Sequence, residues 1–299
     1  MAIERIVIIG AGTMGQGISR TVAATGTDVI LIDLTEEILE HSMHLLSESL
    51  DREIEKWGIT LAEKKAILAR IKTSIDINNV KKASMVIEAL PEDLKVKKEV
   101  FSKLEELCPP ETIIVSNTST LSISEMATYT KRPDKVIGMH FLNPVHKVPL
   151  VEIVRGLKTS DETYNLARDL AVKLDKTPVS VHEYPGYVTT RIIVPFLNEA
   201  MHVLMEGIST ADEIDEAMKL GFGFNMGPLA LADMMGLDEV MSWMDNLLNE
   251  LSEHKYNPCP LLRKMVRGGQ LGVKTGRGFF RYDGEGNRIK EVDRESSRS

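Results

Sequence analysis

The segment Ile6-Val7-Ile8-Ile9 runs directly into Gly10-Ala11-Gly12-Thr13-Met14-Gly15, and Val29-Ile30-Leu31-Ile32 follows one helix length later. The four β-branched residues of the first run predict a strand that is buried on both faces of a parallel sheet. Ile18 and Val22 fall on one face of the helix predicted between the two runs. The order of strand, glycine turn, helix and strand is that of a βαβ unit, and it decides the fold class.

Each glycine of this turn has a separate task if the turn binds a dinucleotide. Gly10 allows a tight turn, Gly12 lets the backbone approach a pyrophosphate, and Gly15 allows the helix to pack closely on the strand. The helix N-terminus then directs its N–H groups at the phosphates. A carboxylate that could bind a ribose, Asp33, ends the second strand. A glycine-rich turn alone is common, but the complete order predicts a cofactor site made of Gly10, Gly12, Thr13, Met14, Gly15 and Asp33.

The cofactor expected at this site is NAD. The carboxylate of Asp33 would repel the 2′-phosphate of NADP, and the next residue is Leu34 rather than an arginine that could receive that phosphate. No metal is expected. The only two cysteines, Cys108 and Cys259, lie in unrelated contexts, which excludes a disulfide framework and a cysteine-based zinc cluster.

Short apolar strands recur along the first part of the chain, separated by helices and loops. They are predicted at residues 85–87, 112–115, 136–139, 151–154 and 177–181. A charged helical stretch is predicted over residues 35–69, with a capping box from Thr60 to Glu63 that opens its second piece. This alternation predicts an α/β fold with a doubly wound, Rossmann-type sheet, and we assign residues 1–184 to this NAD-binding domain.

The pattern changes after Pro185-Gly186, where strand-like runs disappear. Helices are predicted at residues 187–205, 211–220, 229–234 and 237–251, the second with a capping box from Thr210 to Glu213. Residues 185–282 therefore form an all-helical substrate and dimerisation domain, and the polar residues 283–299 are expected to be a solvated tail. The helical domain has more apolar positions than a small bundle can bury, which predicts a homodimer interface; examples are Ile192-Ile193-Val194, Phe196-Leu197 and Met234-Met235.

The composition excludes several classes of protein. Of the 299 residues, 43% are hydrophobic and 27% are charged, as in ordinary soluble proteins rather than disordered chains. The 36 Lys and Arg against 44 Asp and Glu give a net charge of −8, so binding to nucleic acid or to an anionic membrane is not expected. No apolar stretch approaches the length of a transmembrane helix, and a cytoplasmic location is expected.

His140 stands apart from the other six histidines because it directly follows the predicted strand Val136–Met139. Ligands bind at the carboxyl ends of strands in doubly wound sheets. Glu152 lies in the apolar run Leu150-Val151-Glu152-Ile153-Val154, where a buried carboxylate needs a partner. A His140–Glu152 pair satisfies both observations, either as a general base with its orienting carboxylate or as a core ion pair.

The segment around His140 carries a specific resemblance, and its residues are His140-Phe141-Leu142-Asn143-Pro144-Val145 with Glu152 downstream. Together they resemble the signature of the L-3-hydroxyacyl-CoA dehydrogenase family, in particular of its short single-subunit members that act on 3-hydroxybutyryl-CoA. The resemblance covers nearly the whole chain in the same order. It includes Glu88-Ala89-Leu90-Pro91-Glu92 with Lys97, Ser116-Asn117-Thr118-Ser119, Pro185-Gly186-Tyr187, Met226-Gly227-Pro228 with Asp233, Gly236-Leu237-Asp238, and Gly272-Val273-Lys274-Thr275-Gly276-Arg277-Gly278-Phe279.

The resemblance implies roles for individual residues. His140 would be the general base and acid, and Glu152 its orienting partner. Ser119 and Asn143 would contact the reacting oxygen or the nicotinamide. The expected substrate is an acyl-CoA thioester of short chain length.

Further residues would bind the cofactor or the rest of the substrate. Glu92 and Lys97 would border the ribose and diphosphate of NAD, and Asn117 would belong to the same site. Arg52 and Lys56 match positions at which the family has basic contacts to the coenzyme A nucleotide, although a solvated helix face explains the same pattern.

One position departs from the family. Thr190 stands before Arg191, where the family usually has asparagine, so a hydroxyl would replace an amide in the contact with the substrate.

Two other functions fit parts of the sequence. One is a different NAD-dependent dehydrogenase of the β-hydroxyacid or sugar-acid type, and the other is a non-catalytic NAD-binding relative.

Overall fold

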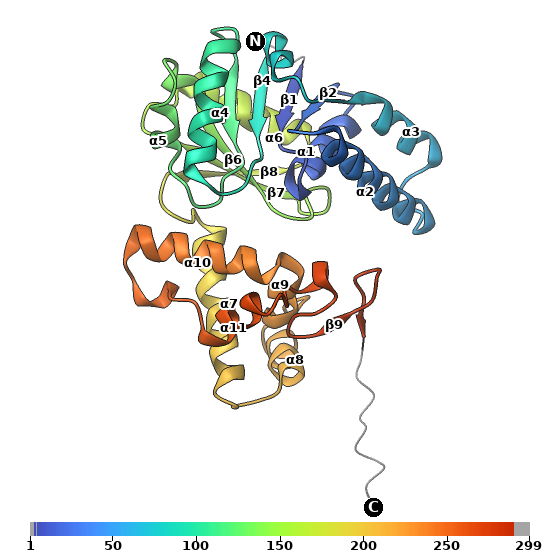
Figure 1. The fold of residues 1–299 in the computed structure, drawn as a ribbon, viewed down its shortest axis with the longest axis vertical. Coiled ribbons are helices and arrows are strands. Elements are labelled where there is room, and N and C mark those ends of the chain that lie inside the picture. The colour runs from blue at the N-terminus through green and yellow to red at the C-terminus, as the bar shows by residue number, and fades with distance from the viewer. Residues whose placement is uncertain (1–2, 4, 290–299) are drawn as a thin grey trace, which may run out of the picture. The chain divides into compact units, whose positions relative to one another are not determined.

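The structure is a computed structural model that describes residue 3 and residues 5–289. Its internal contacts divide the chain into two units, with the division between Tyr187 and Val188. The first unit is built on one large sheet, and the second consists mainly of helices (Figure 1). Within the described residues, no helix is both long and apolar enough to cross a membrane.

The sheet of the first unit has eight strands in the order β3-β2-β1-β4-β5-β6-β7-β8. All neighbours are parallel except β6 and β7, which are antiparallel. This sheet confirms the predicted doubly wound α/β fold. Its strands are β1 (Ile6–Ile9), β2 (Val29–Ile32), β3 (Ile71–Ser74), β4 (Met85–Glu88), β5 (Ile113–Ser116), β6 (Val136–Phe141), β7 (Leu150–Arg155) and β8 (Thr177–His182).

Helices cover both faces of this sheet (Figure 1). Successive residues of β1 point to opposite faces, so that Ile6 and Ile8 pack with α1, α2 and α6, while Val7 and Ile9 pack with α4 and α5. The β-branched run is therefore buried on both faces, as predicted. The helices are α1 (Thr13–Ala24), α2 (Glu36–Glu55), α3 (Leu61–Arg70), α4 (Leu94–Leu107), α5 (Ile123–Ala127) and α6 (Asp161–Lys173), with 3-10 turns η1 (Ile77–Lys82) and η2 (Pro133–Lys135).

The helical stretch over 35–69 forms two helices, and the capping box of Thr60 and Glu63 opens the second, α3, as predicted. Two details of the first unit differ from the predictions. Strand β3 was not expected, because its sequence Ile-Lys-Thr-Ser has a single apolar residue, as is common for an edge strand. Strand β6 continues to Phe141, so His140 lies inside the strand and not after it.

The second unit packs its helices around one apolar core, which contains Leu197, Val240 and Tyr256. The capping box of Thr210 and Glu213 opens α8, as predicted. The C-terminal segment corrects the prediction of a tail: β9 and β10 form a hairpin that includes residues 283–289, while residues 290–299 lie outside the described part. The elements are α7 (Thr189–Met205), α8 (Ala211–Phe222), α9 (Pro228–Met235), α10 (Leu237–Leu251), α11 (Pro260–Arg267), β9 (Arg281–Tyr282), β10 (Arg288–Ile289) and the 3-10 turns η3 (His254–Tyr256) and η4 (Val273–Thr275).

Candidate active site

The glycine turn lies where the strand order reverses, between β1 and β4, which is the ligand-binding position of a doubly wound sheet. Gly10 has φ 103, and a Cβ there would lie 2.6 Å from the Ala89 carbonyl oxygen. A Cβ on Gly15 would lie 1.7 Å from the Gly10 oxygen, whereas one on Gly12 would meet nothing within 4 Å. Gly10 and Gly15 are thus required by the protein's own packing. The open space over Gly12 fits the close approach of a pyrophosphate.

Asp33 holds the same turn from the end of β2. Its carboxylate accepts hydrogen bonds from the backbone N–H of Ala11 at 2.6 Å and of Leu34 at 2.7 Å. Thr13 and Met14 form the first turn of α1, and the N-cap residue Gly12 has no side chain to cap it. The N–H groups of this helix end are therefore suited to an anionic ligand, and the residues present fit NAD.

A buried polar network lies at the carboxyl ends of β4 and β5. Glu88, fully buried, accepts hydrogen bonds from Lys97 Nζ at 2.6 Å, from the Leu90 N–H at 2.7 Å and from Ser116 Oγ at 2.6 Å. Lys97 is also fully buried, and its Nζ donates to the Leu90 carbonyl and lies 3.7 Å from Glu92. The ammonium of Lys97, which was expected to border the cofactor diphosphate, therefore binds carboxylate and carbonyl groups of the protein.

Glu92 holds the loop that follows β5. One of its carboxylate oxygens accepts hydrogen bonds from the backbone N–H groups of Ser119 and Thr120, both at 2.8 Å, and from three hydroxyls, including Thr118 Oγ1 at 2.6 Å and Ser119 Oγ at 3.1 Å. Burial would raise the pKa of Glu92. The charge of Lys97 and these hydrogen bonds outweigh that effect and lower the pKa, so the carboxylate is ionised.

His140 and Glu152 lie directly opposite each other on β6 and β7. His140 Nδ1 is 2.6 Å from Glu152 Oε2, and both side chains are buried. In the neutral imidazole, a carboxylate at this position accepts from Nδ1–H, which leaves the lone pair on Nε2. The ring of Tyr187 lies 5.9 Å from the imidazole, centroid to centroid, and its hydroxyl donates to the Leu121 carbonyl at 3.1 Å. Burial, followed by the nearby carboxylates, raises the pKa of Tyr187 well above its usual value, so it stays neutral.

The loop after β6 is fixed from two sides. Lys176 Nζ donates to the carbonyl oxygens of Val145 at 2.6 Å and of Val148 at 2.8 Å. His146 Nε2 lies 2.8 Å from Glu53 of α2. Asn143, the second residue of this loop, is exposed, which leaves its amide accessible.

The remaining predicted residues lie at other places. Asn117 uses its amide oxygen to accept a hydrogen bond from the Phe141 N–H at 3.0 Å, which joins the ends of β5 and β6. Arg52 and Lys56 are exposed at the end of α2. Thr190 lies in the first turn of α7, in the second unit, and its contact with the substrate stays a prediction.

The sequence did not predict roles for Glu88, Lys176 or Tyr187. Glu88 had the signal that identified Glu152, a carboxylate in an otherwise apolar strand, which needs a partner when it is buried. Lys176 had no such signal, because its acceptors are backbone carbonyls 28 and 31 residues away along the chain.

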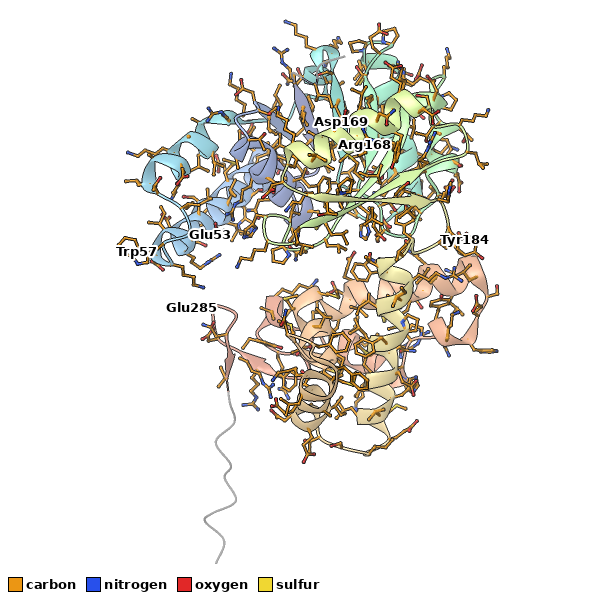
Figure 2. All side chains as sticks on the ribbon, turned by 180° about the vertical axis from the view of Figure 1, so that it is seen from behind. Glu53, Trp57, Arg168, Asp169, Tyr184 and Glu285 are labelled. Atoms are coloured by element: carbon orange, nitrogen blue, oxygen red, sulfur yellow. The ribbon has the colours of Figure 1, made fainter. Side chains whose placement is uncertain are left out.

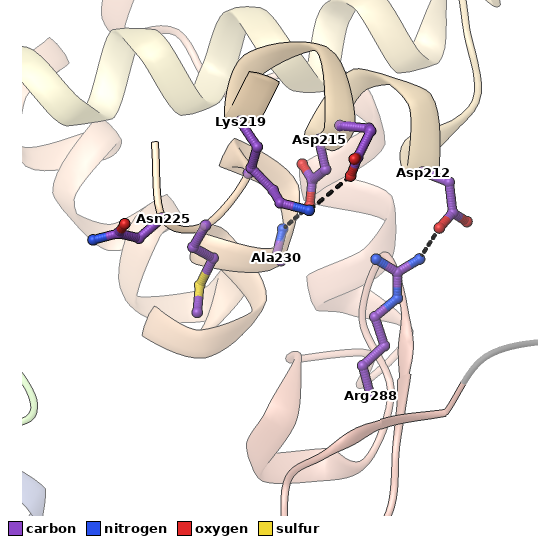
Figure 3. A pocket seen from close by; sticks show the side chains of 9 residues that line it. Asp212, Asp215, Lys219, Asn225, Ala230 and Arg288 are labelled. Carbon is purple, nitrogen blue, oxygen red and sulfur yellow. Dashed lines mark hydrogen bonds and ion pairs between the residues drawn. The ribbon is translucent and has the colours of Figure 1, made fainter. Parts of the chain in front are cut away.

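A separate hollow of about 200 Å³ lies within the second unit (Figure 3). Its charged side chains are engaged with neighbours: Asp215 accepts from the N–H groups of Leu229 and Ala230, Arg288 pairs with Asp212, and Lys219 pairs with Glu216. Contacts within the protein therefore account for the charged side chains that line this hollow.

Within residues 5–289, no group of His, Cys, Asp and Glu side chains is arranged to hold a metal ion.

Known proteins that resemble this chain belong to one family, and the similarity extends along nearly the whole chain. Residues 5–184 match the 3-hydroxyacyl-CoA dehydrogenase NAD binding domain, and residues 186–282 match the 3-hydroxyacyl-CoA dehydrogenase C-terminal domain. A probable 3-hydroxybutyryl-CoA dehydrogenase of Bacillus subtilis is 46% identical, over 95% of this chain and 99% of the relative. A 3-hydroxybutyryl-CoA dehydrogenase of Clostridioides difficile is 45% identical, over 93% of this chain and 99% of the relative.

Solved structures agree with this result. The crystal structure of (S)-3-hydroxybutyryl-CoA dehydrogenase from Ralstonia eutropha has a TM-score of 0.85 and 43% sequence identity, and the match covers 94% of this chain and 100% of that one. The predicted cofactor, NAD, is confirmed by the match of the first unit to an NAD binding domain. Matches to both domains and identities above 40% over almost the full length place this chain in the 3-hydroxyacyl-CoA dehydrogenase family.

Proposed function

We propose that this enzyme catalyses the NAD-dependent oxidation of short-chain L-3-hydroxyacyl-CoA, with 3-hydroxybutyryl-CoA as the expected substrate, and the reverse reduction of the 3-ketoacyl thioester. The observation that carries the proposal is the hydrogen bond of 2.6 Å between His140 Nδ1 and Glu152. This pair lies near the carboxyl end of β6. The glycine turn lies at the carboxyl end of β1 in the same sheet. The names of the relatives support the same substrate.

The residues of this chain account for the movement of the proton. His140 Nε2 takes the proton of the 3-hydroxyl, and Glu152 stabilises the imidazolium that forms. NAD, when bound, accepts the hydride from C3. Burial of the pair strengthens its interaction, because little water screens the carboxylate. In the reduction, His140 returns the proton to the 3-oxygen.

The cofactor and substrate contacts follow from the placement of the other residues. Gly12, Thr13 and Met14 would hold the pyrophosphate, and Asp33 the ribose. Glu92 fixes the Ser119 loop, so that the backbone and hydroxyl of Ser119 have defined positions toward the substrate oxygen. The exposed amide of Asn143 would contact the same oxygen or the nicotinamide.

The activity is tested by following NADH oxidation with acetoacetyl-CoA and with its longer 3-ketoacyl-CoA homologues. We expect turnover that is fastest with the short thioesters. Turnover of free 3-hydroxyacids or sugar acids in place of the thioesters would favour the alternative dehydrogenase class, and binding of NADH without turnover of any of them would favour a non-catalytic protein.

The role of Thr190 is tested in the same assay. Thr190→Val keeps the shape of the side chain and removes the hydroxyl. We expect kcat/KM to fall several-fold with the thermal stability unchanged, because one neutral hydrogen bond contributes about 0.5 to 1.5 kcal/mol. Unchanged kinetics would remove Thr190 from the substrate site.

We also propose a homodimer formed through the second unit, in a cytoplasmic protein. The apolar residues that support this interface differ in part from those expected, because Val194 and Leu197 belong to the core of the unit. Large apolar side chains are instead exposed on α7, on α8 and on the segment after α8. They are Ile192, Leu220, Phe222, Phe224 and Met226.

A further inference from the structure

Tyr187, the last residue of the first unit, combines a strained backbone with a buried side chain. It closes a turn that begins at the exposed Tyr184 (Figure 2), whose carbonyl accepts from the Tyr187 N–H at 2.9 Å. Its φ of 49° lies in the left-handed region, which a bulky residue rarely adopts. The other non-glycine residues of the described chain with such a φ, Trp57, Asp175 and Ser252, are all exposed. Strain at a buried residue persists because its contacts enforce it, and it is frequent at functional sites.

The segment from Glu183 to Tyr187 is held along the start of α5 and the loop before it. The carboxylate of Glu183 accepts hydrogen bonds from Ser122 Oγ at 2.5 Å and from the Ser124 N–H at 2.9 Å. Four residues later, the hydroxyl of Tyr187 donates to the Leu121 carbonyl at 3.1 Å. The side chain of Tyr187 therefore ends at the loop that contains Ser119.

This loop is itself tied together from Thr118 to Leu121. The Leu121 N–H donates to Thr118 Oγ1 at 3.0 Å, and that hydroxyl donates to Glu92 at 2.6 Å. The same carboxylate oxygen accepts from the Ser119 N–H at 2.8 Å. A hydrogen bond to the Leu121 carbonyl therefore restrains the position of Ser119 as well.

The ring of Tyr187 lies beside the candidate base. Its centroid is 5.9 Å from that of the His140 imidazole, the two rings are tilted by 56°, and both side chains are buried. One side chain thus contacts His140 with its ring and the Ser119 loop with its hydroxyl.

The hydroxyl of Tyr187 is suited to holding this loop and unsuited to proton transfer. Burial raises the pKa of Tyr187 well above its usual value, and the carboxylates of Glu92, Glu183 and Glu152 add to the effect. A general acid works best with a pKa near the working pH. The phenol therefore keeps its proton and remains a donor to the Leu121 carbonyl.

We propose that Tyr187 is a positioning residue that keeps the Ser119 loop at a fixed place relative to the imidazole of His140. This inference rests on the proposed function, in which His140 takes the proton of the 3-hydroxyl and Ser119 contacts the same oxygen. Both groups must reach one oxygen in one geometry, and small displacements of such groups slow a reaction markedly. Tyr187 takes no part in the proton transfer itself.

The kinetic test uses Tyr187→Phe, which keeps the ring and removes the hydroxyl. We expect kcat with acetoacetyl-CoA to fall about 3- to 10-fold, because one neutral hydrogen bond is lost, while KM for NADH stays unchanged. Tyr129→Phe is the matched control, since it removes a phenolic hydroxyl that donates to Glu125 at 3.0 Å in the same unit. It should change neither quantity.

A double-mutant cycle with Ser119→Ala separates positioning from a general loss of stability. If Tyr187 acts by placing Ser119, then Tyr187→Phe should change kcat by no more than about twofold once the Ser119 hydroxyl is absent. A purely structural role would lower kcat by the same factor in both backgrounds.

Amide hydrogen exchange measures the restraint without turnover. In Tyr187→Phe we expect faster exchange of the N–H groups of residues 118–121, because the loop has lost its bond at the Leu121 carbonyl. Exchange in β1, residues 6–9, should stay unchanged in the same sample.

Several results would overturn the proposal. They are an unchanged kcat in Tyr187→Phe, an equal loss with and without the Ser119 hydroxyl, and unchanged exchange in residues 118–121. Loss of the alkaline limb of the pH profile in Tyr187→Phe would also overturn it, since Tyr187 would then transfer a proton itself. Failure of the proposed function looks different, because the unmodified protein would not turn over acetoacetyl-CoA, whereas exchange in the variant would still report on the restraint.

Discussion

His140 and Glu152 face each other across the antiparallel pair of β6 and β7, in register, with 2.6 Å between Nδ1 and Oε2. Side chains opposite each other in a ladder lie on the same face of the sheet, and a slip of one residue would turn one of them to the other face. The register of this antiparallel pair therefore places the imidazole beside the carboxylate that orients it.

Removal of either member of this pair should affect the proton and not the cofactor. For His140→Gln and for Glu152→Gln we expect kcat to fall roughly 10²- to 10⁴-fold, with the affinity for NADH nearly unchanged. Steady-state kinetics and NADH fluorescence titration measure the two quantities separately. Near-normal turnover, or a loss of NADH binding along with it, would contradict the assigned roles.

NADH should be strongly preferred over NADPH, because the carboxylate of Asp33 would face the 2′-phosphate. Two unit charges 4 Å apart interact by ~4 kcal/mol at an effective dielectric constant of 20, so a discrimination of about 10²-fold or more is expected. Asp33→Asn should reduce this discrimination while keeping an oxygen that accepts from the Ala11 N–H. The ratio of kcat/KM for the two cofactors is the measurement, and equal values in the unmodified enzyme would refute the role of Asp33.

Lys97→Met should destabilise the first unit, because it leaves the buried Glu88 carboxylate without its cation. Breaking one side of a buried ion pair costs about 3 to 5 kcal/mol. Denaturant unfolding monitors the change in the free energy of unfolding. Lys95→Met on the same helix removes an exposed lysine and is the control. A stability equal to that of the control would show that the pair contributes little.

The stability of the second unit should depend on pH through Asp233. Burial raises the pKa of its carboxyl to about 6, although the N–H groups of Phe279 and Phe280 and the hydroxyl of Tyr282 donate to it. A pKa raised in the folded state stabilises the fold at pH below the unfolded value, and this contribution is lost as the pH rises through about 6.

The difference in unfolding free energy between the unmodified protein and Asp233→Asn measures this effect. Two pKa units correspond to about 3 kcal/mol. We therefore expect the unmodified protein to lose about 3 kcal/mol relative to the variant between about pH 4 and pH 7. A difference that does not change with pH would mean that Asp233 has the same pKa in the folded and unfolded chain.

The proposed dimer should depend on the exposed apolar side chains of α7, of α8 and of the segment after α8. Light scattering should give a mass twice the 33.3 kDa of the chain. Phe222→Asp should shift the mass toward the monomer, because the interface would have to bury an unpaired charge. Val172→Asp, at an exposed apolar position of α6, is the control and should leave the mass unchanged. A monomer of the unmodified protein at micromolar concentration would exclude the dimer.

The sequence by itself determined the doubly wound sheet, the glycine turn and the change to helices after Pro185-Gly186. These features are local: the apolar face of a strand or helix, a capping residue and a turn glycine are each specified by residues close together in the chain. The edge strand β3 was not predictable in this way, because a strand with one apolar residue has little pattern, and its pairing with β2 is what defines it.

Only the tertiary structure decided which partners meet at the site. A carboxylate in an apolar strand indicates that it has a partner, but it does not identify the partner. The sequence alone could not show that Glu88 binds Lys97, or that Glu92 binds the loop from Thr118 to Thr120. Lys176 shows the limit most clearly, since its acceptors are carbonyl oxygens that every residue possesses. Pairing between distant segments depends on register and on loop paths that pack the whole unit, and these are fixed by the sum of many contacts and not by any one stretch of residues.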